Sequence, residues 1–210
     1  YFIKLKYSIN KKEDSQFVQT TKEKRTLEEQ YTFNLQYLKY ACREYQKSWN
    51  RINDQFSHYI EKTTGYKWKY NTYHCFVSPI HEGISNWGTS NKIIRWWKEN
   101  SNIQRRITAH ELIISHYFTI IKKYYPKEKL TNKQIWALAE IAGFALTSFP
   151  PATKKFWPWD KSGYYYNHNY QTLVKLQKEL KQPFLKRKNF DDYIKKGISL
   201  VKKYPGINFC

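Results

Sequence analysis

The residues best suited to chemistry are a histidine and two glutamates in apolar surroundings near the middle of the chain. His110 and Glu111 are adjacent, and Glu111 is the only fully charged side chain between Arg106 and Lys122. Glu140 is isolated in the same way in a second apolar stretch. An unpaired buried charge is very costly, so each carboxylate must be paired, protonated or bound to a metal ion. The function therefore depends on what these side chains face.

Two consecutive helices are expected to position these three side chains. Residues 101–125 are apolar on nearly every side, the pattern of a buried helix, and their first residues fit a capping box, Ser101-Asn-Ile-Gln104. Thr131-Asn-Lys-Gln134 fits another capping box and opens a helix that ends at Pro150-Pro151. If His110 and Glu140 were buried separately, two polar side chains would lack a partner. We therefore expect Glu140 to face His110 across the helix pair.

Three segments have the pattern of β-strands. Residues 1–9, 73–77 and 91–97 are rich in aromatic and β-branched side chains, which are enriched in strands. The second and third segments flank a loop that contains Gly83 and Gly88. We therefore expect either an irregular hairpin or an edge strand beside a cleft.

The remaining segments predict helices and connections. Thr26-Leu-Glu-Glu29 fits a capping box and opens a helical pattern toward residue 62 that ends at Gly65. The polar residues 10–25 predict an exposed connection. The C-terminal part has an aromatic, proline-containing stretch that predicts a surface loop, followed by two shorter helical patterns; these lie at residues 152–168, 169–181 and 190–203.

Length and cysteine content limit the fold class and the compartment. A chain of 210 residues can bury one sizeable core, so we predict a single helix-rich α+β domain over residues 1–210. Its core is expected at residues 66–150, with a helical extension at 152–210. Three cysteines with no framework spacing favour a reducing, cytoplasmic location. No apolar run approaches the roughly 20 residues of a membrane span.

His110-Glu111 on a buried helix, followed by Glu140 on the next helix, resembles the site of gluzincin-type zinc metallopeptidases. In that family the glutamate after the first histidine activates water as a general base, and a glutamate on a later helix completes the zinc site. The resemblance covers about residues 66–150. It implies a zincin-like fold with a small sheet packed on the His-Glu helix, Zn²⁺ as cofactor and Glu111 as the catalytic base. It also implies a peptide substrate held along the edge strand.

The chain departs from the family at the second zinc-binding histidine. That position, four residues after His110, is Ile114, and the next histidine, His116, lies about 120° around the helix from His110. On a regular helix His110 and His116 cannot both bind one zinc ion. The metal ligands implied are therefore His110, Glu140 and His81, with His74 and His168 as further options for the third. A distorted helix, or a metal-free and inactive site, remains an alternative.

The charge leaves a second function class open. Lys and Arg outnumber Asp and Glu by 37 to 17, giving a net charge of +20, which could indicate a polyanionic partner or a compositional bias of the whole chain. Several tryptophans near basic residues could stack on the bases of a single-stranded nucleic acid. They are Trp87, Trp96, Trp97, Trp157 and Trp159. The alternative to a peptidase is therefore a non-catalytic basic binding module on a degenerate zincin-like core.

Overall fold

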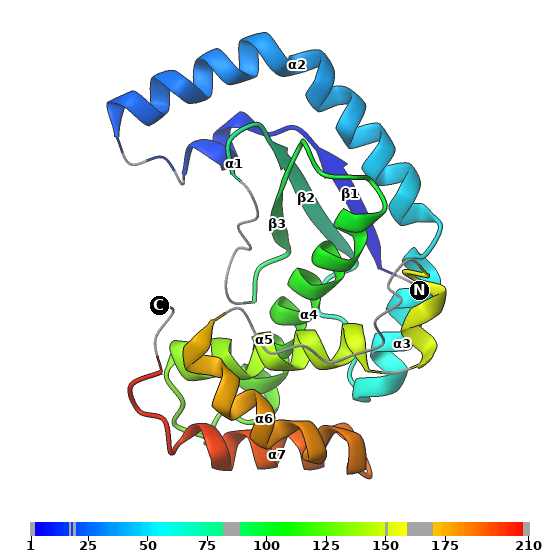
Figure 1. Ribbon diagram of the computed structural model, residues 1–210, viewed down its shortest axis with the longest axis vertical. Helices are drawn as coiled ribbons and strands as arrows, with labels where there is room; N and C mark the ends of the chain where they lie inside the picture. Colours follow the sequence, from blue (N-terminus) through cyan, green and yellow to red (C-terminus); the bar gives the residue numbers. More distant parts are fainter. Residues whose placement is uncertain are drawn as a thin grey trace.

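Helices form most of the molecule and surround one small sheet (Figure 1). The computed structural model describes residues 3–16, 18, 20–81, 89–149, 151–158 and 170–207. In chain order the elements are β1 (Lys4–Ser8), α1 (Lys11–Ser15), α2 (Thr21–Asn50), α3 (Asn53–Thr64), β2 (Thr72–Ser78), β3 (Lys92–Trp96), α4 (Ile103–Tyr124), α5 (Asn132–Ser148), the 3-10 helix η1 (Pro151–Lys155), α6 (Gln171–Lys186) and α7 (Phe190–Val201). The predicted helix-rich α+β class is confirmed.

Within the described residues, the sheet consists of parallel strands in the order β1-β2-β3. Tyr7, Cys75 and Ile93 lie beside one another across it. Parallel neighbours need a crossover connection instead of a tight turn, so the hairpin considered between β2 and β3 is wrong. The edge strand of the other expectation is confirmed, because β3 lies at one edge of the described sheet, and the cleft beside it stays a prediction.

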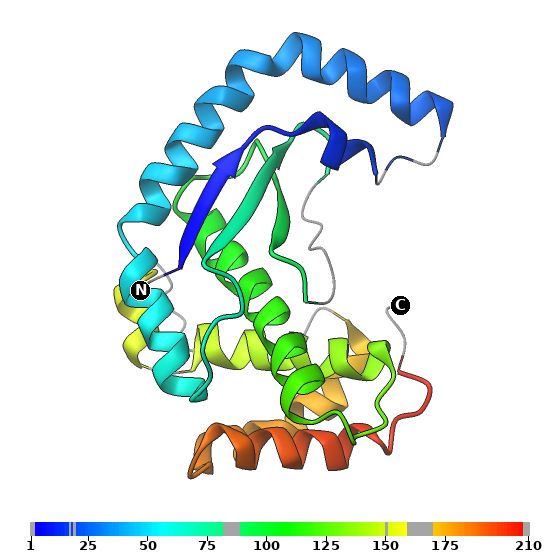
Figure 2. The ribbon, with the colours of Figure 1, turned by 180° about the vertical axis from the view of Figure 1, so that it is seen from behind.

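The other edge, β1, is covered by α2, which runs alongside it when the molecule is seen from behind (Figure 2). The side-chain amide of Gln46 on α2 accepts a hydrogen bond from the Tyr7 N–H at 2.9 Å and donates one to the Leu5 carbonyl at 2.9 Å. These are backbone groups that an edge strand otherwise leaves open. The Gln46 amide therefore satisfies two backbone groups of β1 that a neighbouring strand would otherwise bind.

The long helix α2 begins earlier than predicted. Thr20 and Glu23 form its capping box, whereas Thr26 lies inside the helix and donates a hydrogen bond to the Lys22 carbonyl. Both sites have the Thr-x-x-Glu spacing, so the pattern alone did not distinguish them. Residues 10–25 are not simply an exposed connection, because they contain α1 and the first turn of α2.

Gly65 ends the helical region, as predicted. Its φ of 78° is left-handed, a conformation that favours glycine and commonly closes a helix. The region before it is two helices instead of one, since a break between Asn50 and Asn53 separates α2 from α3.

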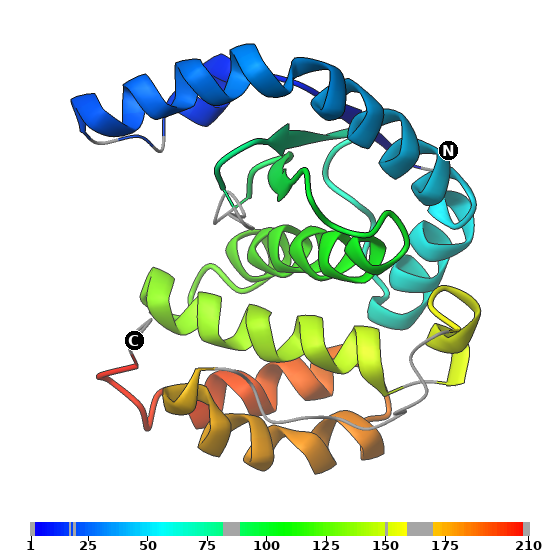
Figure 3. The same ribbon diagram turned by 45° about the horizontal axis from the view of Figure 1, so that its top comes forward.

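Below the sheet, α4 packs against α5, and α6 and α7 lie on the far side of α5 (Figure 3). The Tyr7 hydroxyl ties β1 to α4 by hydrogen bonds to Gln104 at 2.9 Å and Thr108 at 3.3 Å. The capping box expected at Ser101 does not form, because Gln104 instead donates its side-chain amide to the Ser101 carbonyl. The box that opens α5 at Thr131 forms as predicted.

The aromatic stretch after α5 is partly buried, contrary to the surface loop predicted for residues 152–168. Phe156 and Trp157 are 0% and 1% exposed. Phe156 packs edge-to-face on Phe56 of α3, and the Trp157 indole N–H donates to the Thr147 carbonyl at 3.0 Å. The predicted helical extension is present as α6 and α7, and residues 159–169 lie outside the described part of the chain. None of the described helices is long and apolar enough to cross a bilayer.

Candidate functional site

His110 and Glu140 meet between α4 and α5. The distance from His110 Nε2 to Glu140 Oε2 is 2.8 Å, and the two side chains are only 14% and 10% exposed. The expectation that Glu140 faces His110 is confirmed. The two isolated polar groups satisfy each other, which explains how two apolar helices can bury them.

One face of α5 is shaped to receive the His110 ring. Gly143 lies one turn after Glu140, and a Cβ atom at Gly143 would be only 2.6 Å from His110 Nδ1. Phe144 packs edge-to-face on the His110 ring, with centroids 5.4 Å apart. Sequence reasoning missed both residues. A signal existed, because a glycine inside a helix destabilises it by roughly 0.5–1 kcal/mol relative to alanine and usually has a packing reason.

The surroundings favour the protonated form of His110. Burial alone would lower its pKa, but the negative charge of Glu140 and the hydrogen bond to Glu140 outweigh burial, and the charge of Glu111 adds to them. Arg106 opposes them, and the net result is a pKa above the usual value. His110 therefore holds a proton more strongly than an exposed histidine, unless another cation replaces it.

Glu111 lies on α4 beside this pair and is half-buried. Its charge acts on His110 and on Cys75 of β2, so the carboxylate is close to His110 on its own helix and to the sheet. Cys75 itself is no nucleophile, because burial raises the pKa of its thiol well above the usual value. Glu140 already contacts His110, so Glu111 is a second carboxylate near the ring.

The structure does not bring the predicted third ligand to this pair. His81 lies beside α1, where its Nε2 is 3.3 Å from the Asp14 carbonyl oxygen and 3.8 Å from the Asp14 carboxylate. His74 stacks on Phe76, on the face of β2 opposite Cys75. His168 lies outside the described residues. Among the residues that the structure describes, no three His, Cys, Asp or Glu side chains are grouped as a metal site would require.

His116 faces away from the pair, as its position on the helix predicted. Its Nε2 is 3.4 Å from Thr64 Oγ1, and its ring lies against Trp68 with centroids 4.5 Å apart. Burial lowers its pKa to about 3. His116 is therefore a neutral core residue.

The donor atoms of His110 and Glu140 partly fit a zinc ion. Two ligands that bind one tetrahedral Zn²⁺ at about 2.0–2.1 Å lie roughly 3.3 Å apart. The observed 2.8 Å is a direct hydrogen bond, so the pair must open by only about half an ångström to take an ion. Of the three implied ligands, the structure brings His110 and Glu140 together, and His81 lies elsewhere.

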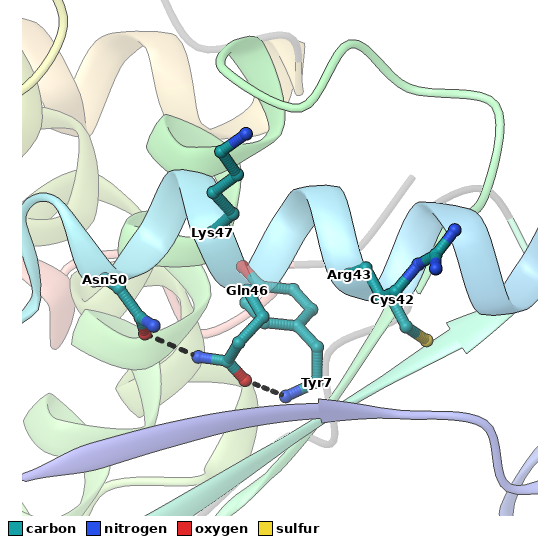
Figure 4. A pocket seen from close by; sticks show the side chains of 6 residues that line it. All are labelled: Tyr7, Cys42, Arg43, Gln46, Lys47 and Asn50. Carbon is teal, nitrogen blue, oxygen red and sulfur yellow. Dashed lines mark hydrogen bonds between the residues drawn. The ribbon is translucent and has the colours of Figure 1, made fainter.

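A hollow of about 510 Å³ lies between α2 and β1 (Figure 4). Gln46 is central in it, bonded to the Tyr7 backbone and to Asn50. Cys42 also lines it, but burial raises the pKa of this thiol to about 12, which keeps it protonated and unreactive. We therefore assign no chemistry to this hollow.

The tryptophans proposed to stack on bases differ in access. Trp157 is buried in the core and cannot contact a nucleic acid. Trp96 and Trp97, at the end of β3, are half-buried, and the Lys98 ammonium lies 5.8 and 5.1 Å from their ring centroids. Trp87 and Trp159 fall outside the described residues.

Comparison with protein-family models, with curated proteins and with solved structures gave no match. The assignment of a function therefore depends on the geometry of the chain itself.

Proposed function

We propose that this chain is a zincin-like metallohydrolase that cleaves peptide bonds. His110 and Glu140 are the metal ligands in this proposal, and Glu111 is the general base. The supporting observation is the 2.8 Å contact between His110 and Glu140 on consecutive buried helices, with Glu111 next to it on α4. This pair is part of the arrangement that the resemblance to gluzincins implies, and the third ligand is not part of it.

Each residue has a definite task. A bound Zn²⁺ would polarise a peptide carbonyl and make water more acidic. His110 would hold the metal through the Nε2 that contacts Glu140, and its ring would have to be neutral to do so. Glu111 accepts the proton of the attacking water and passes it to the leaving amine. Phe144 and Gly143 hold the His110 ring in place.

The sheet supports a peptide as the substrate. β3 pairs with β2 on one side and is an edge strand of the described sheet. An extended peptide can add to such an edge through main-chain hydrogen bonds. β3 also packs against α4, the helix that carries His110 and Glu111.

Elemental analysis tests the proposal directly. Protein purified without chelators should contain one Zn²⁺ per chain and lose it on the substitution Glu140→Ala. Hydrolysis of an unstructured protein such as casein should stop when the metal is removed and return when zinc is added. Wild-type protein without stoichiometric metal, still folded by circular dichroism, contradicts the metallohydrolase proposal.

A second candidate is a basic module that binds single-stranded nucleic acid. It is favoured by the accessible parts of Trp96 and Trp97 beside Lys98 and by the net charge of +20. Loss of one stacked base should weaken binding by about 1–3 kcal/mol in the variant Trp96→Ala. If binding instead depends on salt alone and Trp96→Ala leaves it unchanged, the charge reflects composition.

A further inference from the structure

A groove rich in lysine lies at the C-terminal end of α4, beside the segment that links α3 to β2. It has a volume of about 520 Å³. Its lining residues are Lys67, Trp68, Lys69, Thr89, Thr119, Ile120, Lys122, Lys123 and Tyr124. This lysine groove contains four ammonium groups and no carboxylate among its lining residues.

Most of this positive charge is not paired with a carboxylate among the residues that the structure describes. Lys67 forms an ion pair with Glu61. Lys69, Lys122 and Lys123 are exposed and have no ion pair with any described carboxylate. The Lys122 and Lys123 ammonium groups lie 5.7 and 5.0 Å from the Phe118 and Tyr124 ring centroids. These contacts keep the side chains near the groove while their charge stays available.

The floor of the lysine groove is formed by buried side chains held by hydrogen bonds, and it is partly apolar. Trp68 and Thr119 are 9% and 8% exposed. The Trp68 indole donates to the Ser57 carbonyl at 3.3 Å, and its ring packs against His116. The Thr119 hydroxyl donates to the Ser115 carbonyl at 3.0 Å. A ligand would therefore meet a preformed surface with exposed cationic side chains around it.

The groove is separate from the His110–Glu140 pair. From His110 to Lys122 the helix rises by about 18 Å at 1.5 Å per residue. A ligand in the groove therefore does not need the proposed metal site, and its presence does not depend on the proposed hydrolase activity.

We propose that the lysine groove binds a small anion with two or more linked phosphate groups, either free or as part of a nucleotide. Lysine binds phosphate as a point charge, and three ammonium groups that form no ion pair with a described carboxylate match the charge of a pyrophosphate unit. The volume is in the range of about 300–1,000 Å³ typical of small-molecule sites. The four lysines are clustered around one hollow, whereas the other basic residues are scattered over the chain.

Titration calorimetry with inorganic pyrophosphate and with ATP tests this site. The salt concentration should be about 0.15 M, where distant surface charges are largely screened. Both probes should bind the wild type with one site per chain. The double variant Lys69→Glu/Lys123→Glu should lower the affinity by about tenfold or more, because contacts with charged groups are strong. Equal affinity for the two probes identifies the phosphate chain as the ligand. Tighter binding of ATP indicates that its nucleoside also contacts Trp68.

A matched control separates a site from general charge. Lys24 and Lys188 are exposed, lie outside the groove and form no ion pair with a described carboxylate. The double variant Lys24→Glu/Lys188→Glu changes the net charge by the same amount and should alter the affinity by about twofold at most. All variants are checked for folding by circular dichroism.

Four outcomes overturn the proposal. They are no binding to the wild type, an equal loss in the groove and control variants, loss of pyrophosphate binding on Glu140→Ala, and a single-stranded oligonucleotide that binds more tightly than either probe and depends on Lys69 and Lys123. The third would place the anion at the proposed metal site, and the fourth would make the groove part of a nucleic-acid surface.

Discussion

The two histidines of α4 are six residues apart on one helix, and their surroundings differ completely. His110 faces α5, where a carboxylate contacts its Nε2 and raises its pKa. His116 faces α3 and Trp68, where burial lowers its pKa to about 3. Both are enclosed by the protein, so the difference comes from what each ring meets and not from solvent access.

This difference separates a charge-paired histidine from a neutral core histidine. Burial disfavours the charged form of either ring, and only His110 has a nearby negative charge that reverses the effect. The His110 ring lies beside a carboxylate and could exchange its proton for a metal ion. The neutral His116 ring packs on Trp68 and has no described carboxylate beside it. The comparison therefore supports the role proposed for His110, and it leaves His116 as a core residue.

The largest expected effect is on metal content. His110→Ala should abolish stoichiometric zinc, because it removes the nitrogen that contacts Glu140. His116→Ala should retain zinc even if it lowers stability, because its ring faces the opposite side of α4. Elemental analysis of both variants, with folding verified by circular dichroism, makes the measurement. Equal loss of metal would show that the two histidines converge and that α4 is distorted.

Glu111→Gln is expected to affect the rate and little else. It keeps the size and hydrogen-bonding capacity of the side chain but removes the base, which typically contributes about 10²–10⁴-fold to the rate. Peptidase activity should fall by that factor while zinc content and melting temperature stay close to those of the wild type. A clear drop in melting temperature with unchanged specific activity of the folded fraction would make Glu111 a structural carboxylate.

Much of the fold could be predicted from local patterns. Strands expected at 1–9, 73–77 and 91–97 correspond to β1, β2 and β3, and the two buried helices appear as α4 and α5. Apolar periodicity and strand composition are local properties, so they can be recognised in the sequence. The relative direction of two strands is not a local property. β2 and β3 are parallel, and the composition of the segment between them did not indicate this.

The candidate site was predictable only where two helices alone determine it. Glu140 could be placed opposite His110 because both are isolated on consecutive apolar helices. The position of His81 depends on α1, a short helix that was expected to be a connection, and α1 carries the Asp14 that His81 contacts. Gly143 was not recognised because its role is the absence of a side chain, which acquires meaning only when a ring lies against it.

The pH dependence of stability tests the other half of the comparison. His116 has a lowered pKa in the folded protein and an ordinary value of 6.5 when unfolded. Below pH 6.5 the unfolded chain therefore binds a proton that the folded chain does not, and stability falls toward pH 3. Between about pH 5.5 and 4 this contributes a slope of about 1.4 kcal/mol per pH unit. The free energy of unfolding of His116→Gln, measured by urea titration, should lack that part of the slope. An unchanged slope would mean that His116 is protonated in the folded state.

The smallest expected effect concerns the helix surface that holds the His110 ring. At Gly143 a Cβ atom would lie 2.6 Å from His110 Nδ1, a distance that forces the ring to move. At Gly197 on α7 it would lie 3.1 Å from Leu138 Cδ2, the end of a flexible side chain that can shift. Both glycines are inside helices, so alanine gains roughly 0.5–1 kcal/mol of helix stability at each.

Gly197→Ala should therefore be neutral or slightly stabilising. Gly143→Ala should be net destabilising by about 1 kcal/mol, because overpacking costs about 1–3 kcal/mol and exceeds the gain in helix stability. Urea unfolding of the two variants gives the difference, and the histidine NMR signals of Gly143→Ala should show displacement of His110 with His116 unchanged. If Gly143→Ala stabilises the protein as much as Gly197→Ala does, the ring has room to move, and α5 does not fix the geometry that distinguishes His110 from His116.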